Sequence, residues 1–169
     1  MKIDDLRLSD RGRLLVLLNA ANRGGLIIYR EFFDSYVWLI NERKILPFYY
    51  PFGMNPFPRS RELEEQLRVS VGDGEVGNGF LALITADDVK WISGCVGKII
   101  NFEEIKERFL KRYVYITRKG KEWVSQQVGI ASDFEEVTDD LIRCLKLFVN
   151  RNRDELFRLI YDAVQSPKE

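Results

Sequence analysis

The sequence predicts an α+β fold that is mostly helical, and three observations lead to this prediction. Apolar residues recur at spacings of three and four over most of the chain, which is typical of amphipathic helices. A glycine-rich turn signal covers residues 72–79, and short β-type runs follow at 80–84 and 113–116. The chain has 169 residues, 46% of them hydrophobic, which is enough for one domain with a core and an appendage.

The N-terminal part predicts two helices, at 9–22 and 30–45. Ser9 or Asp10 can cap the first helix, because a side-chain oxygen there accepts a hydrogen bond from the unpaired N–H groups of the first turn. Pro47 ends the second helix, since proline lacks a backbone donor and clashes with the preceding turn.

Residues 47–58 hold four of the five prolines and five large aromatic rings, so they predict an extended loop. This loop either folds back over the core or forms an exposed recognition surface. A helix at 59–71 follows, with Ser60 as its N-cap. The run GDGEVGNG at 72–79 predicts a hairpin turn, and 80–84 predicts a strand.

The next segment predicts helices at 87–96, 102–112 and 117–127, with a β-type run at 113–116. Thr117 is the expected N-cap of the third of these helices. We expect the following side chains to be buried together in the core: Leu15, Leu18, Val37, Leu63, Leu67 and Trp123.

The last segment, 133–164, predicts either one long helix with a polar step at 150–153 or two helices. Its apolar stripe is too hydrophobic to face water, so it packs on its own chain or pairs with a second copy. We expect a homodimer in which the stripe makes the partner contact through Phe134, Leu141, Leu145 and Phe148.

Composition excludes several classes of protein. The chain has no histidine, which removes imidazole as a base, proton shuttle or metal ligand. Since no nucleophile–base motif is present either, the sequence predicts a non-enzymatic protein without catalytic residues, metal or cofactor. Cys95 and Cys144 predict two reduced, buried thiols, with a single structural disulfide as the alternative.

The same evidence indicates a compartment and a source. The N-terminus has no signal-peptide pattern, and no apolar run approaches the ~20 residues that span a bilayer. We therefore expect a cytoplasmic protein with no membrane partner. Arginine outnumbers lysine while Gln, Cys and Met are scarce, a composition that favours a thermophilic source.

Three motifs together resemble winged-helix proteins. Residues 113–120 read YVYITRKG, which is similar to the Y-x-L-T-x-K-G strand-to-helix step of many winged-helix regulators, with Ile116 in place of leucine. Residues 52–60 resemble the Y-G-P-F-S-x-x-L loop of the YwgA-like and Panacea-type winged-helix families, with Asn55 in place of glycine and two residues inserted. Residues 28–39 lie where those families connect their first two helices.

The resemblance implies a winged helix-turn-helix domain at 8–128 and leaves 129–169 as a C-terminal helical segment. The order of three helices followed by a turn-rich hairpin agrees with it. Panacea-type members are associated with toxin neutralisation and other protein contacts, and the wider superfamily with DNA binding.

A basic cluster favours DNA as the partner. Five positive charges and no acid occur within eleven residues, at Lys111, Arg112, Arg118, Lys119 and Lys121. Such a density suits phosphate contacts, and the alternative is a solvated basic face beside a sheet edge. The helix at 59–71 also carries three glutamates, and it adds candidate contacts to base edges at Arg59, Arg61 and Arg68.

The favoured function is therefore a protein that binds double-stranded DNA, a transcription regulator. The alternative is a winged-helix protein-interaction module, antitoxin-like or adaptor, that does not bind DNA.

Overall fold

A group of helices around one central helix makes up most of the structure. The computed structural model describes residues 1–82, 85–99, 101 and 110–165. Over these residues the predicted class is confirmed: the fold is α+β and mostly helical, with seven α-helices and small antiparallel sheets. None of the helices in this part combines the length and the apolar character that crossing a bilayer requires.

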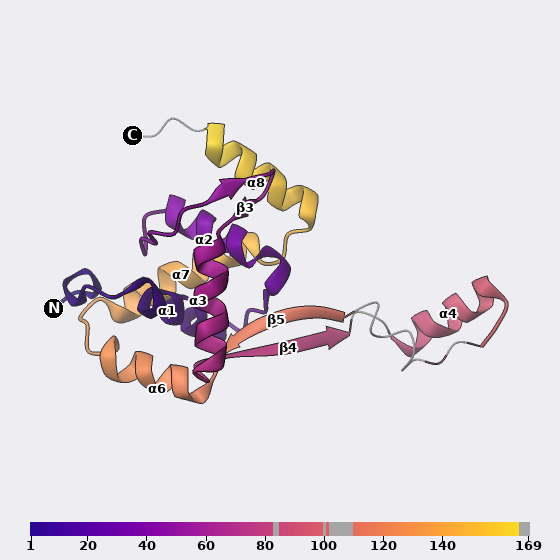
Figure 1. Cartoon of the computed structure of the whole chain (residues 1–169), viewed down its shortest axis with the longest axis horizontal. Coiled ribbons are helices and arrows are strands. Elements are labelled where there is room, and N and C mark those ends of the chain that lie inside the picture. The colour runs from indigo at the N-terminus through magenta and orange to yellow at the C-terminus, as the bar shows by residue number, and fades with distance from the viewer. Residues whose placement is uncertain (83–84, 100, 102–109, 166–169) are drawn as a thin grey trace.

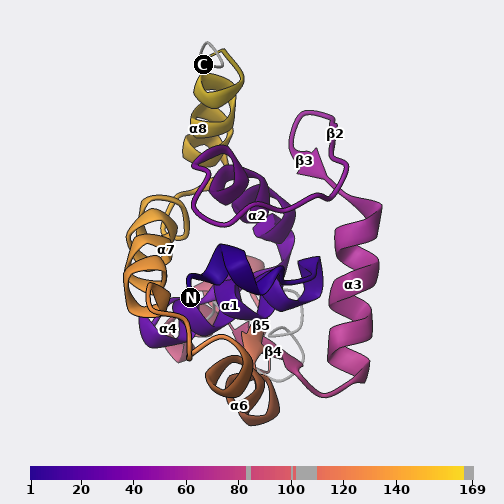
Figure 2. The same cartoon turned by 90° about the vertical axis from the view of Figure 1, so that its left-hand side faces the viewer.

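The elements form a helical body from which one β-hairpin projects, with α4 at its far end (Figure 1). Figure 2 views the body end-on, with α1 in the middle and α7, α6, α3 and α2 around it. Along the chain they are η1 (Ile3–Leu6), α1 (Asp10–Arg23), β1 (Ile28–Tyr29), η2 (Arg30–Phe32), α2 (Phe33–Glu42), β2 (Gly53–Met54), β3 (Pro58–Arg59), α3 (Arg61–Gly72), β4 (Val76–Ala82), α4 (Ala86–Val96), β5 (Leu110–Ile116), α6 (Arg118–Gln127), α7 (Phe134–Phe148) and α8 (Arg153–Gln165).

The central helix is α1, and it forms where it was predicted. The side chain of Ser9 accepts a hydrogen bond from the N–H of Gly12 at 3.2 Å, so Ser9 is the N-cap. Residues 14–21 are all buried, because α6, α7 and β5 pack against this helix from different sides. Its broad apolar face is thus explained by neighbours that surround it rather than by one partner.

The second helix, α2, is shorter than predicted at both ends. Residues 30–32 form the 3₁₀ turn η2, and the α-helix runs from Phe33 to Glu42. Two residues later Lys44 adopts a left-handed conformation with φ of 56°, which turns the chain out of the helix before Pro47.

The aromatic loop that follows α2 folds back over the core, so the first of the two alternatives is correct. Phe48 and Phe57 are 3% and 7% exposed. The Phe57 ring lies 6.2 Å from that of Phe32 and 5.9 Å from that of Phe157 on α8. The short strands β2 and β3 pair within the loop, and Tyr49 remains 71% exposed.

The third helix, α3, and the expected core are confirmed in most respects. The Ser60 side chain accepts a hydrogen bond from the N–H of Leu63 at 3.2 Å. Of the six side chains expected in the core, Trp123 is only partly buried, and the other five are buried: Leu15, Leu18, Val37, Leu63 and Leu67.

The main sheet has the antiparallel order β1–β5–β4, and it corrects two predictions. Strand β4 begins at Val76 rather than residue 80, so the turn is confined to residues 73–75. Residues 110–112 belong to β5 rather than to a helix at 102–112, because they pair with residues 80–82 of β4. Residues 102–109 of that predicted helix, and residues 83–84 of the predicted strand, lie outside the described residues.

Helix α4 is confirmed, with Thr85 as its N-cap. It lies beyond the end of the β4–β5 hairpin, away from the helical body (Figure 1). This position leaves Cys95 exposed, so the prediction of a buried thiol is wrong there, while Cys144 on α7 is half-buried. Both cysteines are free.

The C-terminal segment is two helices, α7 and α8, and it is part of the core. Helix α7 packs against α1 and α2, and α8 packs against α2. The expectation that the α7 stripe meets a second copy is wrong, because its side chains are no more than 5% exposed within one chain: Phe134, Leu141, Leu145 and Phe148. The described part of the C-terminal segment, residues 129–165, is thus built into the same hydrophobic core as the residues that precede it.

Candidate nucleic-acid interface

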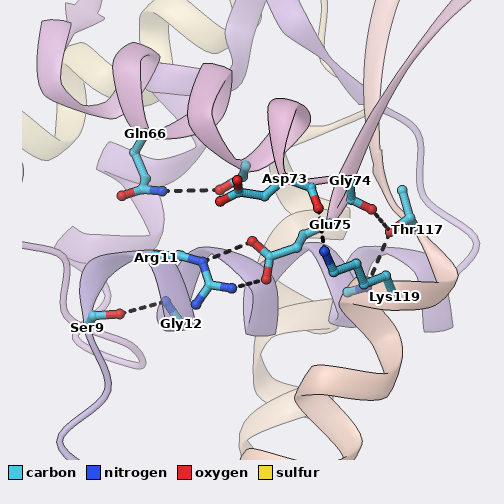
Figure 3. Close-up of polar contacts among 11 residues, drawn as sticks. Ser9, Arg11, Gly12, Gln66, Asp73, Gly74, Glu75, Thr117 and Lys119 are labelled. Carbon is cyan, nitrogen blue, oxygen red and sulfur yellow. Dashed lines mark hydrogen bonds and ion pairs between the residues drawn. The ribbon is translucent and has the colours of Figure 1, made fainter.

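Three of the predicted DNA contacts lie together at the start of α6. Arg118, Lys119 and Lys121 occupy its first turn and are all exposed. Thr117 caps the helix: its hydroxyl accepts from the N–H of Gly120 at 3.2 Å and donates to the Gly74 carbonyl at 2.6 Å (Figure 3). We call Arg118, Lys119 and Lys121 the α6 cluster.

Main-chain contacts fix the α6 cluster to the turn between α3 and β4. The N–H of Thr117 donates to the carbonyl oxygen of Glu75 at 3.0 Å. The ammonium group of Lys119 donates to the carbonyl oxygen of Asp73 at 2.7 Å. A Cβ on Gly120 would lie 2.4 Å from the Glu75 carbonyl oxygen, so this approach of helix to turn requires glycine. The positions of the three cations are therefore set by the backbone.

One buried carboxylate lies beneath this turn, and it is neutralised locally. The Glu75 side chain is 3% exposed. Arg11 donates to both of its oxygens, from Nε to Oε1 at 2.9 Å and from Nη2 to Oε2 (Figure 3). The Arg11 guanidinium also lies 5.2 Å from the ring centroid of Trp123. Because Arg11 compensates Glu75, this carboxylate does not offset the charge of the α6 cluster.

The α6 cluster has a small local excess of positive charge, because Asp73, Glu75 and Glu122 line the same hollow as Arg11 and Lys119. The first turn of α6 contains no acidic residue, and the N-terminal end of a helix carries a partial positive charge of its own. Arg118 pairs with Glu122 at 3.1 Å, but the two side chains are 92% and 58% exposed, so water screens the pair. Cations at this end oppose the helix dipole, and together with it they attract an anion such as phosphate.

Lys111 and Arg112 do not join the α6 cluster in one patch. Successive strand residues point to opposite faces of a sheet. The Lys111 ammonium lies 4.9 Å from the ring centroid of Tyr29, whereas the Arg112 guanidinium lies 5.6 Å from that of Phe80. The five cations that are close in sequence are therefore divided between two sheet faces and a helix end.

The exposed face of α3 has fewer available cations than its sequence indicates. Arg68 donates from Nε to Glu65 at 3.1 Å, and both side chains are exposed. This hydrogen bond is the main cause that holds the pKa of Glu65 below its ordinary value. Arg59 donates to a main-chain carbonyl of η2 at 3.3 Å, and Arg61 is exposed.

The structure also brings together three tyrosines that the sequence did not single out as a site. Tyr29 pairs with Tyr113 across β1 and β5, and the ring centroids of Tyr113 and Tyr115 are 5.9 Å apart. The signal in the sequence was the matched spacing of Gly77 and Gly79 on β4 with Tyr115 and Tyr113 on β5. That match can be recognised only once the strand register is known.

Comparison with known proteins adds no assignment: no protein-family model, curated protein or solved structure matches the chain. Among the described residues, no group of three or more His, Cys, Asp or Glu side chains is placed to hold a metal ion. Function is inferred below from the fold and the surface of this chain.

Proposed function

We propose that the protein is a non-enzymatic winged-helix protein that binds double-stranded DNA and acts as a transcription regulator. The chain order α1, α2, α3 and then the β4–β5 hairpin supports a winged helix, and so does the pairing of β1 with β5 at the edge of that hairpin. The connection between α2 and α3 is longer than in an ordinary helix-turn-helix, because the aromatic loop lies within it.

The observation that carries the proposal is the α6 cluster. Three exposed cations stand at the positive end of a helix without a carboxylate in the first turn. Cations at the N-terminus destabilise an isolated helix. The same arrangement suits a phosphate backbone, because neutralising the phosphates releases counterions and drives association. In this proposal the cluster holds the phosphates, while Arg61 and Arg68 on α3 and Arg112 on β5 add weaker contacts.

The test is a charge-reversed variant, R118E/K119E/K121E, measured against duplex DNA by fluorescence anisotropy at several salt concentrations. We expect affinity to fall by at least about tenfold at ~0.1 M salt and the slope of log K against log salt to become shallower by about 2–3. Glutamate at a helix N-terminus is favourable and offsets the loss of the exposed hydrogen bond from Lys119 to Asp73, so the melting temperature should change little.

The matched control is R143E/K146E/R158E, which makes the same change of charge at exposed positions of α7 and α8. We expect this control to retain most of the affinity. Equal loss in the two triple variants, or unchanged affinity in the α6 variant, would overturn the proposal.

One observation favours a second candidate function, a protein-interaction module. Trp91 is 72% exposed on α4, and nearby Val96 and Ile99 are 53% and 98% exposed. The aromatic loop and the α7 stripe, which the sequence offered as protein contacts, are largely buried, whereas α4 presents an exposed apolar surface for such a contact, as does α8 at Phe157, Tyr161 and Val164.

This candidate is tested by sedimentation of the wild type and of Trp91→Lys/Ile99→Lys over a range of concentrations. Self-association through α4 predicts a wild-type mass that rises with concentration and a variant that stays monomeric. Equal behaviour of the two chains would reject self-association through α4.

A further inference from the structure

The outer face of the main sheet carries a row of tyrosine rings. Because strand residues alternate, the side chains on either side of Tyr113 and Tyr115 point to the opposite face. Those neighbours, Val114 and Ile116, are each 2% exposed, and Ile28 beside Tyr29 is 3% exposed. The three tyrosines therefore point away from the core, and we call them the tyrosine face.

Two glycines of β4 leave room for the rings of Tyr113 and Tyr115 to extend over the neighbouring strand. Gly77 pairs with Tyr115 and Gly79 with Tyr113. A Cβ on Gly77 would lie 2.3 Å from Cζ of Tyr115, and a Cβ on Gly79 would lie 2.1 Å from Cζ of Tyr113. Glycine inside a strand weakens it unless another group must approach closely. Each ring thus lies over a glycine, and the planes of the two rings are tilted by 41° to one another.

The three tyrosines are accessible to different extents. Tyr115 is 43% exposed, while Tyr29 and Tyr113 are half-buried. Flat aromatic faces of this kind stack unpaired bases, because every base has a π-face, whereas bases inside a duplex are already stacked on one another.

Positive charge stands at both ends of the tyrosine face. Lys111 shares the face and lies over Tyr29, and Arg30 lines the same shallow hollow as these two residues. At the other end the chain runs from Tyr115 through Thr117 into the α6 cluster. Arg112 and Glu31 also line the hollow. Arg30 pairs with Glu64 of α3 at 3.8 Å, so three cations face two carboxylates there. This charge favours an anionic polymer over a neutral sugar, the other ligand class that stacks on tyrosine.

We infer that the tyrosine face binds single-stranded DNA, with bases stacked on Tyr113 and Tyr115 and phosphates held by Lys111 and the α6 cluster. The inference rests on the proposed nucleic-acid function and adds a second form of DNA to it. Duplex binding depends on the α6 cluster, whereas single-strand binding depends in addition on the aromatic rings.

The test compares two double variants on a labelled oligothymidylate of about 12 nucleotides. Y113L/Y115L keeps an apolar cover over the two glycines but removes the π-faces, whereas Y113F/Y115F keeps the rings. We expect the leucine pair to weaken binding by at least about tenfold and the phenylalanine pair to stay within about twofold of wild type. Tyr161→Leu, at a 55% exposed tyrosine of α8, is the control and should bind as wild type does.

Duplex affinity of the same variants separates this inference from the proposed function. We expect duplex binding to survive in Y113L/Y115L and to be lost in R118E/K119E/K121E. Wild-type oligothymidylate affinity in Y113L/Y115L would overturn the inference and leave the duplex proposal standing. Absence of duplex binding by the wild type, with ring-dependent binding of the oligomer, would overturn the proposed function alone.

A second measurement is independent of folding in the variants. An oligomer containing 5-bromodeoxyuridine is photocrosslinked to the wild-type chain, and the modified peptide is identified by mass spectrometry. We expect the crosslink at Tyr113 or Tyr115. Crosslinking elsewhere only, or tighter binding of an oligouridylate RNA than of DNA, would refute single-stranded DNA as the ligand of this face.

Discussion

Arg11 and Glu75 form an ion pair that joins the central helix to the turn before β4. The guanidinium donates to both carboxylate oxygens, and the glutamate side chain is 3% exposed while the arginine side chain is 32% exposed. The main chain of the same glutamate accepts the N–H of Thr117, so one residue connects α1, the turn and the start of α6. The position of the α6 cluster therefore depends on this pair.

Removal of one partner of this pair should destabilise the fold. Arg11→Met leaves the Glu75 carboxylate buried and unpaired, and we expect it to lower the free energy of unfolding by roughly 1–3 kcal/mol in urea titrations. The double variant Arg11→Met/Glu75→Leu should recover much of that loss, because no charge then remains buried. Arg118→Met is the matched control from an exposed pair, and a change there as large as in Arg11→Met would contradict the argument.

Gly120 should not tolerate a side chain. In Gly120→Ala the new Cβ would meet the carbonyl oxygen of Glu75 at 2.4 Å and a side-chain carbon of Ile116 at 2.7 Å, so α6 must shift. We expect a loss of about 1–3 kcal/mol, the usual cost of overpacking. Gly72→Ala, where a Cβ has open space, should be neutral or stabilising. Thermal unfolding of the two variants tests the difference, and equal melting temperatures would refute it.

The buried Asp34 carboxyl should lower the free energy of unfolding as pH rises above the acid range. It is 1% exposed, and its Oδ2 accepts the N–H of Ser60 at 2.9 Å. Burial is the main cause that raises its pKa above the ordinary 3.8. The folded state then binds more protons than the unfolded state between that value and the raised pKa, so the stability contribution is lost as pH rises through this window.

Asp34→Asn removes this titration and keeps an oxygen that can accept the N–H of Ser60. We expect the stability of the variant relative to wild type to increase as pH rises through the window, in urea unfolding at a series of pH values. Asp88→Asn provides a control of opposite sign, because hydrogen bonds from Thr85 lower the pKa of the Asp88 carboxyl. Parallel pH profiles for wild type and Asp34→Asn would contradict the prediction.

A chain that ends at Ala131 should not fold. It lacks α7, whose buried stripe packs on α1 and α2, and it would expose the apolar surface of both helices. We expect this chain to lose cooperative thermal unfolding. We also expect it to bind a hydrophobic dye. As a point substitution, Leu141→Ala should cost about 2–5 kcal/mol, whereas Leu147→Ser, at a position 42% exposed on the same helix, should cost little. For the chain that ends at Ala131, cooperative thermal unfolding would contradict this prediction and show that α7 is dispensable for folding.

The elements that local chemistry determines could be predicted from the sequence. Ser9, Ser60 and Thr117 each cap the helix that was expected after them, because capping needs only a side chain and the next three residues. The break between α7 and α8 was likewise visible as a polar step in the apolar stripe.

The elements that depend on distant partners could not be predicted. Gly77 and Gly79 indicate a turn when they are read alone, yet they lie in a strand because the rings of Tyr115 and Tyr113 cover them. Residues 110–112 continue a helical pattern in the sequence but pair with β4 in the structure. Contacts with the neighbouring strand therefore outweigh the local helix propensity. For the candidate site, the α6 cluster was expected, whereas the separation of Lys111 from Arg112 required the strand register.

The projecting hairpin gives the molecule two levels of amide protection against hydrogen exchange. At its base, Val114 and Ile116 are buried in the body, whereas Phe80 farther along is 57% exposed. Ladder amides beside Ile116 should therefore exchange only when the core opens, whereas the ladder amide of Lys111 should exchange once the outer strand pairs separate. The β4–β5 ladder is continuous, but its inner end opens with the core and its outer end opens as a separate, less stable unit.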